Sequence, residues 1–188
     1  CPTGMRRLLF KLIDNEIRNA KKGSEALITI KMNSLSDIVL IQKLYEAAKA
    51  GVKLRMIIRG IFCMLTENGH FKAVPQAVSI VDQYLEHSRV LIFHNSGKNK
   101  VYISSADWMV RNLDHRVEAA VEIKAPQLKQ ELADYLNIQL QDNVKARILD
   151  NKLSNEYVSK KGKAIRSQVE IYNYLFQKTI KTVETGSN

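Results

Sequence analysis

The sequence has 188 residues, 45% of them hydrophobic and 26% charged, which fits one globular domain with a sizeable core. Lysine and arginine outnumber aspartate and glutamate by 29 to 19, and the formal net charge of +10 favours an anionic partner such as nucleic acid, a phospholipid surface or a phosphate polymer. Cys1 and Cys63 are too few for a disulfide framework and lack metal-ligand spacing, which indicates a reducing compartment. No apolar run is long enough for a membrane span or a secretion signal, so we expect a chain that is soluble or bound to a membrane from outside. Because it begins with Cys rather than Met, we expect it to be part of a longer polypeptide.

A helix and a strand are predicted at the start of the chain. Residues 5–23 repeat apolar side chains at helical spacing and end at Gly23, which predicts an amphipathic helix with a glycine terminus. Residues 26–32 (ALITIKM) are typical of a short strand. We expect this strand to end at Lys31 and Asn33, which places both side chains at its carboxyl end.

A second helix and a second strand follow. Ser34 and Asp37 resemble a capping box and predict the start of a helix over residues 36–51. Residues 52–60 (VKLRMIIRG) alternate apolar side chains, which predicts a strand that delivers Arg59 at its carboxyl end. Strand, helix and strand together predict a β-α-β unit.

The middle of the chain is predicted to hold a loop, a helix and three strands. Residues 62–77 contain a glycine and a proline without a clear period and indicate a loop, in which the apolar surroundings of Cys63 predict a buried thiol. Residues 78–87 have the spacing of a helix of about three turns that carries His87 at its end. Alternating or apolar runs predict strands over residues 89–93, 101–105 and 114–123.

The last third of the chain is predicted to be helical. Residues 127–140 and 164–181 each show an apolar stripe, and the charged segment 143–163 is interpreted as a linker between them. The stripes favour helices that brace the sheet, although contact with substrate stays open. The alternation of strands and helices predicts an α/β fold with a mixed β-sheet flanked by helices on both faces, and with polar residues at strand ends, where such sheets bind ligands.

Polar residues at the predicted strand ends form one candidate site. His87 and Arg89 are two residues apart and are expected to project from the same face of a strand. The next strand and the segment after it supply Ser104, Ser105, Asp107, Arg111 and Asn112. Arginine binds phosphate oxygens in a bidentate manner and histidine exchanges protons near neutral pH, so this set suits phosphoryl transfer. Arg59, at another strand end, adds a second cation.

These residues also have purely structural interpretations. His87 can cap a helix, Arg59 can pair with a carboxylate, and the two serines can satisfy backbone groups in a turn. The combination favours a site, because several independent phosphate-binding features fall at strand ends of one sheet. The remaining histidines are scattered, and no metal ligand is assigned.

The segment from His87 to Asp107 resembles the His-x-Lys and Gly-Ser-x-Asn motifs of the phospholipase D superfamily. His87 matches the motif histidine and Ser105 the motif serine. Arg89 occupies the position of the motif lysine and His94 that of the motif aspartate, which is unlike a plain phosphodiester hydrolase of this superfamily.

A longer resemblance covers nearly the whole chain. The phrases KMNSLSD, LYEAAKAGVKLRMIIRG, SIVDQYLEHSRV, YISSADWMVRNLDHRVE and VKARILDNKLSNEY are similar to the last domain of the bacterial polyphosphate kinase family, which makes long polyphosphate from ATP. The resemblance implies that residues 1–188 form one domain, the second phospholipase-D-like domain of a longer kinase, with the helical tail 124–188 packed on it. The loop of residues 62–77 departs from the family.

The resemblance also implies an activity and a set of site residues. The ATP γ-phosphate is expected to pass reversibly, through a phosphohistidine, to the growing polyphosphate chain. The nucleophilic histidine and the ligands of Mg²⁺ are expected in the upstream domain. His87 is then the histidine that faces the nucleophile as general acid or base, and Arg59 the arginine that binds nucleotide phosphate. The ATP and phosphate contacts are assigned to Lys31, Asn33, Arg59, His87, Arg89, Ser104, Ser105, Arg111 and Asn112.

The expected partners are polyphosphate, ATP or ADP, and the upstream domains, within a homo-oligomeric, cytoplasmic enzyme that binds the inner face of the membrane. The isolated domain is expected to be inactive. Two other functions stay open: a homodimeric, single-motif phosphodiesterase or nuclease of the phospholipase D superfamily, and a non-catalytic module for nucleic acid or anionic membranes. The sequence lacks the aromatic residues with which proteins stack single strands, and nucleic acid is not an expected partner.

Overall fold

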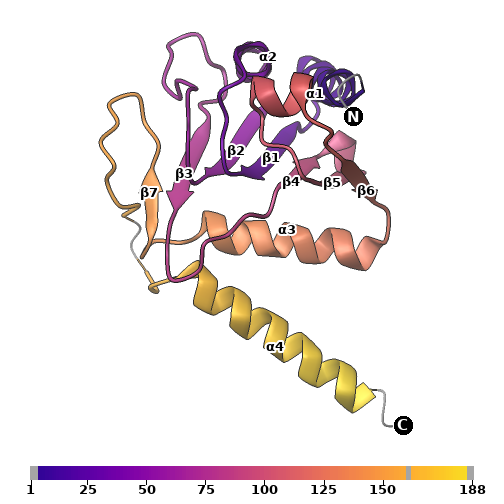
Figure 1. Ribbon diagram of the computed structural model, residues 1–188, viewed down its shortest axis with the longest axis vertical. Helices are drawn as coiled ribbons and strands as arrows, with labels where there is room; N and C mark the ends of the chain where they lie inside the picture. The colour runs from indigo at the N-terminus through magenta and orange to yellow at the C-terminus, as the bar shows by residue number, and fades with distance from the viewer. Residues whose placement is uncertain (1–3, 160–161, 186–188) are drawn as a thin grey trace.

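The computed structural model describes residues 4–159 and 162–185, so Cys1 lies outside the described residues. Its centre is a seven-stranded mixed sheet with the strand order β6-β5-β4-β1-β2-β3-β7 (Figure 1). The strands are β1 Leu27–Met32, β2 Lys53–Ile58, β3 Gln76–Ile80, β4 Val90–Phe93, β5 Lys100–Ser104, β6 Ala120–Ile123 and β7 Ala146–Ile148. The α-helices are α1 Met5–Lys21, α2 Ile38–Ala50, α3 Pro126–Leu140 and α4 Ser167–Thr185, with short helical turns at Asn95–Gly97 and Arg111–His115. The expected mixed sheet is confirmed.

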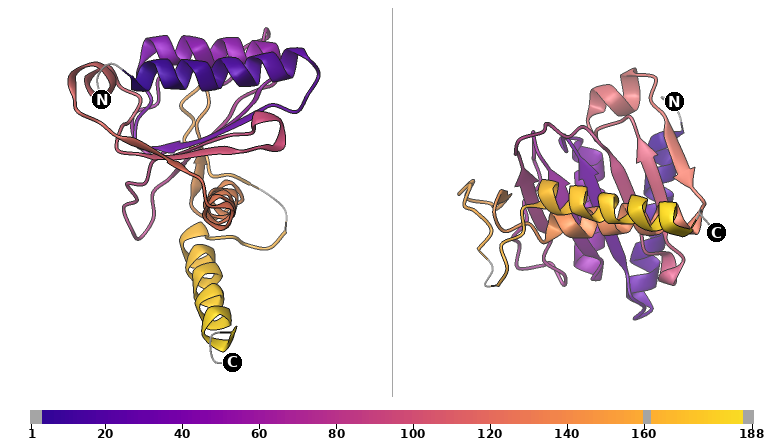
Figure 2. Two further views of the ribbon diagram at one scale, coloured as in Figure 1. Left: turned by 90° about the vertical axis from the view of Figure 1, so that its right-hand side faces the viewer. Right: turned by 90° about the horizontal axis from the view of Figure 1, so that it is seen from below.

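Helices cover both faces of the sheet, as expected. Figure 2 shows α1 and α2 side by side on one face and α3 on the other. The alternation of β1 explains this arrangement, because Ile28 and Ile30 belong to the core with α1 and α2, whereas Lys31 on the opposite face lies over the ring of Tyr135 in α3. Leu136 of α3 is buried against the same face.

The ends of α2 combine a confirmed prediction with a correction. Gly51 ends the helix with φ of 101° in the left-handed region that glycine adopts without strain. The predicted capping box is wrong, because Asp37 itself is the N-cap and accepts a hydrogen bond from the Leu40 N–H. Ser34 cannot begin the helix because its backbone carbonyl accepts from the Trp108 N–H in an extended segment.

The predicted helix over residues 78–87 is wrong. Residues Gln76–Ile80 form β3, which pairs in parallel with β2 and antiparallel with β7, and residues 81–89 form neither helix nor strand. The apolar residues of this segment suit a helix locally, yet pairing with β2 fills backbone hydrogen bonds that a helix would leave open at the sheet edge. His87 therefore lies on an irregular connection and does not end a helix.

Three smaller predictions also need correction. The strand expected over residues 114–123 shrinks to β6, because Arg111–His115 forms a helical turn. The segment interpreted as a linker, 143–163, contains β7, a three-residue edge strand. Cys63 is exposed and not buried, because the loop turns the neighbouring Met64 into the core in its place.

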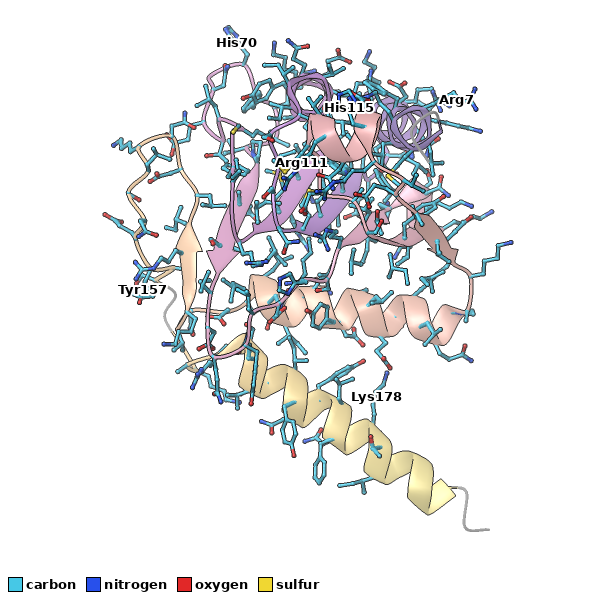
Figure 3. The ribbon with its side chains drawn as sticks, in the orientation of Figure 1. Arg7, His70, Arg111, His115, Tyr157 and Lys178 are labelled. Carbon is cyan, nitrogen blue, oxygen red and sulfur yellow. The ribbon has the colours of Figure 1, made fainter. Side chains whose placement is uncertain are left out.

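The two C-terminal helices differ in their contacts. Whereas α3 lies on the sheet, α4 projects away from the body of the domain (Figure 2). Between the two helices, Tyr174 donates a hydrogen bond to Asp134 and Lys178 forms an ion pair with Glu131; Figure 3 shows Lys178 between α4 and α3. In the described part of the chain, no helix combines the length and apolar character needed to cross a membrane.

Candidate functional site

Strand direction brings the predicted site residues to one edge of the sheet. β1 and β2 are parallel, so Asn33 and Arg59 follow their carboxyl ends side by side. β4 runs antiparallel to β1 with Val90 opposite Lys31, which puts the start of β4, and with it Arg89, at the same edge. β5 is antiparallel to β4 and ends there at Ser104. Residues far apart in the sequence therefore meet at this edge.

Arg59 is tied to two neighbouring segments. Its Nε donates to the Asn33 side-chain oxygen at 2.8 Å and to the Glu86 backbone carbonyl at 2.7 Å. These bonds use one donor of the guanidinium group, whose remaining N–H groups suit a phosphate ligand. Asn33, predicted as a phosphate ligand, is buried and orients Arg59.

His87 is exposed beside a cavity of about 380 Å³. Its Nδ1 lies 3.1 Å from the Leu85 carbonyl oxygen, a hydrogen bond that the ring makes only as an N–H donor. A neutral ring in this tautomer leaves Nε2 as an acceptor, as a proton-transfer group requires. Arg89, Ser104 and Tyr135 line the same cavity.

Arg89 and Asp107 form a paired, largely buried unit. The Arg89 Nε and Nη2 atoms lie 3.1 Å from the two carboxylate oxygens of Asp107, and Nη1 donates to the His87 carbonyl. Asp107 also accepts from the backbone N–H groups of Asn33 and Ser34. Burial works to raise the pKa of Asp107, but the bonds from Arg89 and the Asn33 N–H outweigh it and hold the pKa below its usual range. Arg89 thus fixes the backbone at His87.

A second polar cluster surrounds Glu118, a residue that the sequence did not single out. The Ser105 hydroxyl donates to one carboxylate oxygen of Glu118 and the Asn112 side-chain N–H donates to the other at 2.6 Å. These bonds outweigh the effect of burial, and the pKa of Glu118 lies below its usual range. No pattern marks Glu118 in the sequence, because it lies within a stretch that reads as an alternating strand. Ser104 instead donates to the Ala119 carbonyl.

The remaining predicted ligands divide between exposed and buried positions. Arg111 is exposed at the start of the helical turn Arg111–His115, and Figure 3 labels both end residues of this turn. Lys31 is 5% exposed, and its ammonium group forms an ion pair with Glu86 at 2.7 Å on the α3 face of the sheet. Burial lowers the pKa of Lys31. His94 lies at the opposite edge of the sheet, where its backbone N–H donates a hydrogen bond to the Leu27 carbonyl.

Residues 1–168 match the family model described as polyphosphate kinase C-terminal domain 2. The chain belongs to this family. Polyphosphate kinases of Vibrio parahaemolyticus and Escherichia coli K12 are 49% and 44% identical to it over 175 residues, which is 93% of this chain and 25% of each relative. This polyphosphate kinase domain therefore spans about a quarter of the length of those relatives.

Solved structures agree with this assignment. The polyphosphate kinase of Porphyromonas gingivalis superposes with a TM-score of 0.89 at 43% identity, over 93% of this chain and 27% of that one. Nuc of Salmonella typhimurium, a phospholipase D family member, superposes with a TM-score of 0.55 at 17% identity, over 78% of this chain and 91% of that one. The second likeness concerns the fold alone, and the expected phospholipase-D-like fold is confirmed.

The resemblance implies magnesium, and the described residues were compared with the ligands that this ion needs. Among residues 4–159 and 162–185, no group of three or more histidine, cysteine, aspartate or glutamate side chains is placed to hold a metal ion. No ligand of Mg²⁺ is therefore assigned among these residues. The expectation that its ligands lie upstream stays a prediction.

We expect the domain to lose stability in acid. The pKa values of the buried carboxyls Asp37, Asp107, Glu118 and Asp142 lie below their usual range, where their hydrogen bonds outweigh the effect of burial. Each therefore contributes stability that is full above about pH 5 and is lost as pH falls through the folded-state pKa. Glu16, whose pKa is raised by burial, acts in the opposite direction.

The four carboxyls with lowered pKa values are expected to outweigh the opposite effect of Glu16. The free energy of unfolding, measured by urea titration, is therefore expected to fall between about pH 5 and pH 2. A free energy that stays constant or rises on acidification would contradict this expectation.

Proposed function

We propose that this domain is the C-terminal catalytic half of a polyphosphate kinase and takes part in reversible transfer of the ATP γ-phosphate to long-chain polyphosphate. The observation that carries the proposal is the placement of His87 and Arg59 at one sheet edge, in a chain of this family. The upstream part of the polypeptide supplies the histidine that becomes phosphorylated. The domain thus contributes half of a composite site.

The chemistry follows from the two side chains. In the first step the bond between the γ-phosphorus of ATP and its β,γ-bridging oxygen breaks, the phosphoryl group bonds to a nitrogen of the upstream histidine, and ADP leaves. In the second step this P–N bond breaks, the phosphoryl group bonds to a terminal oxygen of the polymer, and the upstream histidine is free again. Arg59 neutralises the phosphoryl oxygens during both transfers. His87 gives a proton to the leaving oxygen or takes one from the attacking oxygen, because an imidazole can act both as a proton donor and as a proton acceptor.

Other parts of the proposal concern the surroundings of this reaction. The charge of +10 suits a polymer that carries about one negative charge per phosphate, by the electrostatics that govern nucleic-acid backbones. Arg111 is an exposed cation available to polyphosphate, and Mg²⁺ with ligands upstream accompanies the nucleotide. An enzyme that uses ATP as its phosphoryl donor is expected in the cytoplasm. The family resemblance also favours a homo-oligomer at the inner face of the membrane.

The test uses ATP labelled at the γ-phosphate. We expect the full-length enzyme to form an acid-labile phosphoprotein and labelled polymer, whereas the 188-residue domain alone forms neither. The isolated domain is also expected to leave bis(p-nitrophenyl) phosphate intact. Cleavage of that phosphodiester by the domain, without transfer of label in the full-length protein, would replace the kinase by a homodimeric hydrolase.

A further inference from the structure

The segment that carries His87 has no regular secondary structure of its own. Residues 81–89 connect β3 to β4 without helix or strand. Val81, Tyr84 and Leu85 are exposed, as is His87 itself, so the segment has little apolar packing to hold it. The position of the imidazole therefore depends on polar anchors, and Glu86 directly precedes it.

The Glu86 carboxylate is the acceptor for donors from three separate elements. Its Oε2 atom accepts from Lys31 Nζ of β1 at 2.7 Å, and from Tyr135 Oη and Gln139 Nε2 of α3 at 2.6 Å each. Its Oε1 atom accepts from Gln168 Nε2 of α4 at 3.0 Å. Four donors from one strand and two helices fix both oxygens in one orientation.

Burial makes this arrangement stiff. Gln139 is fully buried, the Lys31 side chain is 7% exposed and that of Glu86 is 19% exposed. Burial alone raises the pKa of Glu86, but the charge and hydrogen bond of Lys31 outweigh it and keep the pKa below its usual range. An ionised pair out of water holds its geometry because separating the partners leaves a buried charge unpaired.

The backbone of Glu86 adds a further anchor. Its carbonyl oxygen accepts from Arg59 Nε at 2.7 Å, so the peptide unit that joins Glu86 to His87 is tied to β2. The other side of His87 is held by Arg89, which donates to the His87 carbonyl. The backbone is therefore held by hydrogen bonds at both Glu86 and His87.

We propose that Glu86 is a positioning residue of the phosphoryl-transfer site: its anchored carboxylate fixes the backbone from which His87 projects. The inference rests on the proposed function, because it gives His87 a task that depends on position. Glu86 itself does not touch the reacting atoms. Its carboxylate faces β1, α3 and α4 through the four donors.

The decisive variant is Glu86→Gln in the full-length enzyme. Glutamine keeps the size of the side chain but replaces one acceptor oxygen by a donor, which then faces Lys31 and Gln139. We expect the kcat of polymer synthesis to fall about tenfold or more, since displacement of a catalytic group by about 1 Å can cost about a hundredfold. The KM for ATP is expected to change less than about threefold, because Arg59 keeps its bond to Asn33.

A double-mutant cycle distinguishes positioning from a general structural effect. If Glu86 acts through His87, then adding Glu86→Gln to His87→Ala slows the enzyme by less than about twofold beyond His87→Ala alone. Losses that multiply in the double variant would overturn the inference. Glu122→Gln is the matched control, since it removes the carboxylate of an ion pair with Lys100 on β5 and β6, and we expect it to leave kcat unchanged.

A milder variant covers the case in which Glu86→Gln does not fold. Tyr135→Phe removes one donor to Glu86 and keeps the ring, and the same cycle with His87→Ala is then applied. If His87→Ala does not slow the full-length enzyme, the role of His87 in the proposed function fails together with the inference. If His87→Ala slows it but the Glu86 or Tyr135 losses persist in the His87→Ala background, only the inference fails.

Discussion

Replacing His87 by alanine in the full-length enzyme is expected to slow polyphosphate synthesis by about a hundredfold or more, since a positioned acid or base contributes about 10²–10⁴ in rate. The imidazole is exposed at the edge where Arg59 and Arg89 are also found, and its Nδ1 bond to the Leu85 carbonyl leaves Nε2 to exchange the proton. The measurement is the rate at which label from γ-phosphate ATP enters acid-insoluble polymer, followed together with labelling of the protein.

The matched control is His70→Ala. His70 is also an exposed histidine, but it lies on the loop between β2 and β3 (Figure 3) and not on the segment that joins β3 to β4. We expect this variant to synthesise polymer at the native rate. Equal rates for the native enzyme and His87→Ala would contradict the assigned role of His87.

The second large effect is expected on stability, for Asp107→Ala in the isolated domain. Asp107 is 7% exposed and accepts hydrogen bonds from Arg89, from the Asn33 side chain and from the backbone of Asn33 and Ser34. Removal leaves the Arg89 guanidinium partly buried without its partner, and loss of one member of a buried ion pair costs about 3–5 kcal/mol. Urea denaturation gives the change in the free energy of unfolding.

Glu156→Ala is the control for Asp107→Ala. Glu156 is exposed on the loop after β7, and a surface substitution of this kind changes the free energy of unfolding by about 0.5 kcal/mol or less. A loss for Asp107→Ala no larger than that of Glu156→Ala would show that the ion pair with Arg89 adds nothing to stability.

Prediction from the sequence succeeded where a local pattern and the tertiary structure demanded the same conformation. The apolar spacing of residues 5–23 and the glycine after residue 50 indicated α1 and the end of α2, and both helices pack their apolar faces on β1 and β2. Residues 78–87 have an equally good helical spacing, yet β2 needs a partner strand there and β3 forms. The spacing of apolar residues within one segment does not indicate whether a strand elsewhere in the chain needs that segment as its partner.

For the site, strand ends were the informative signal. Arg59, Asn33 and Ser104 were predicted at strand ends, and the register of β1, β2, β4 and β5 brings those ends to one edge. Glu86 and Glu118 were not predicted, because their contacts lie across the fold with α3, α4 and the Arg111–His115 turn. The hydrogen-bond partners of these two carboxylates cannot be deduced from residue spacing in the sequence.

The sequence by itself determined the α/β class, the family and the polar residues that follow the strand ends, because periodicity and motif order are local properties. Only the tertiary structure decided which polar residues are free and which are paired. Lys31 and Arg89 read equally well as phosphate ligands, yet folding puts Lys31 against Glu86 on the α3 face and Arg89 against Asp107. A buried charge needs an opposite charge within reach, and the choice of that partner is made by strand register and helix packing, not by neighbours in the chain.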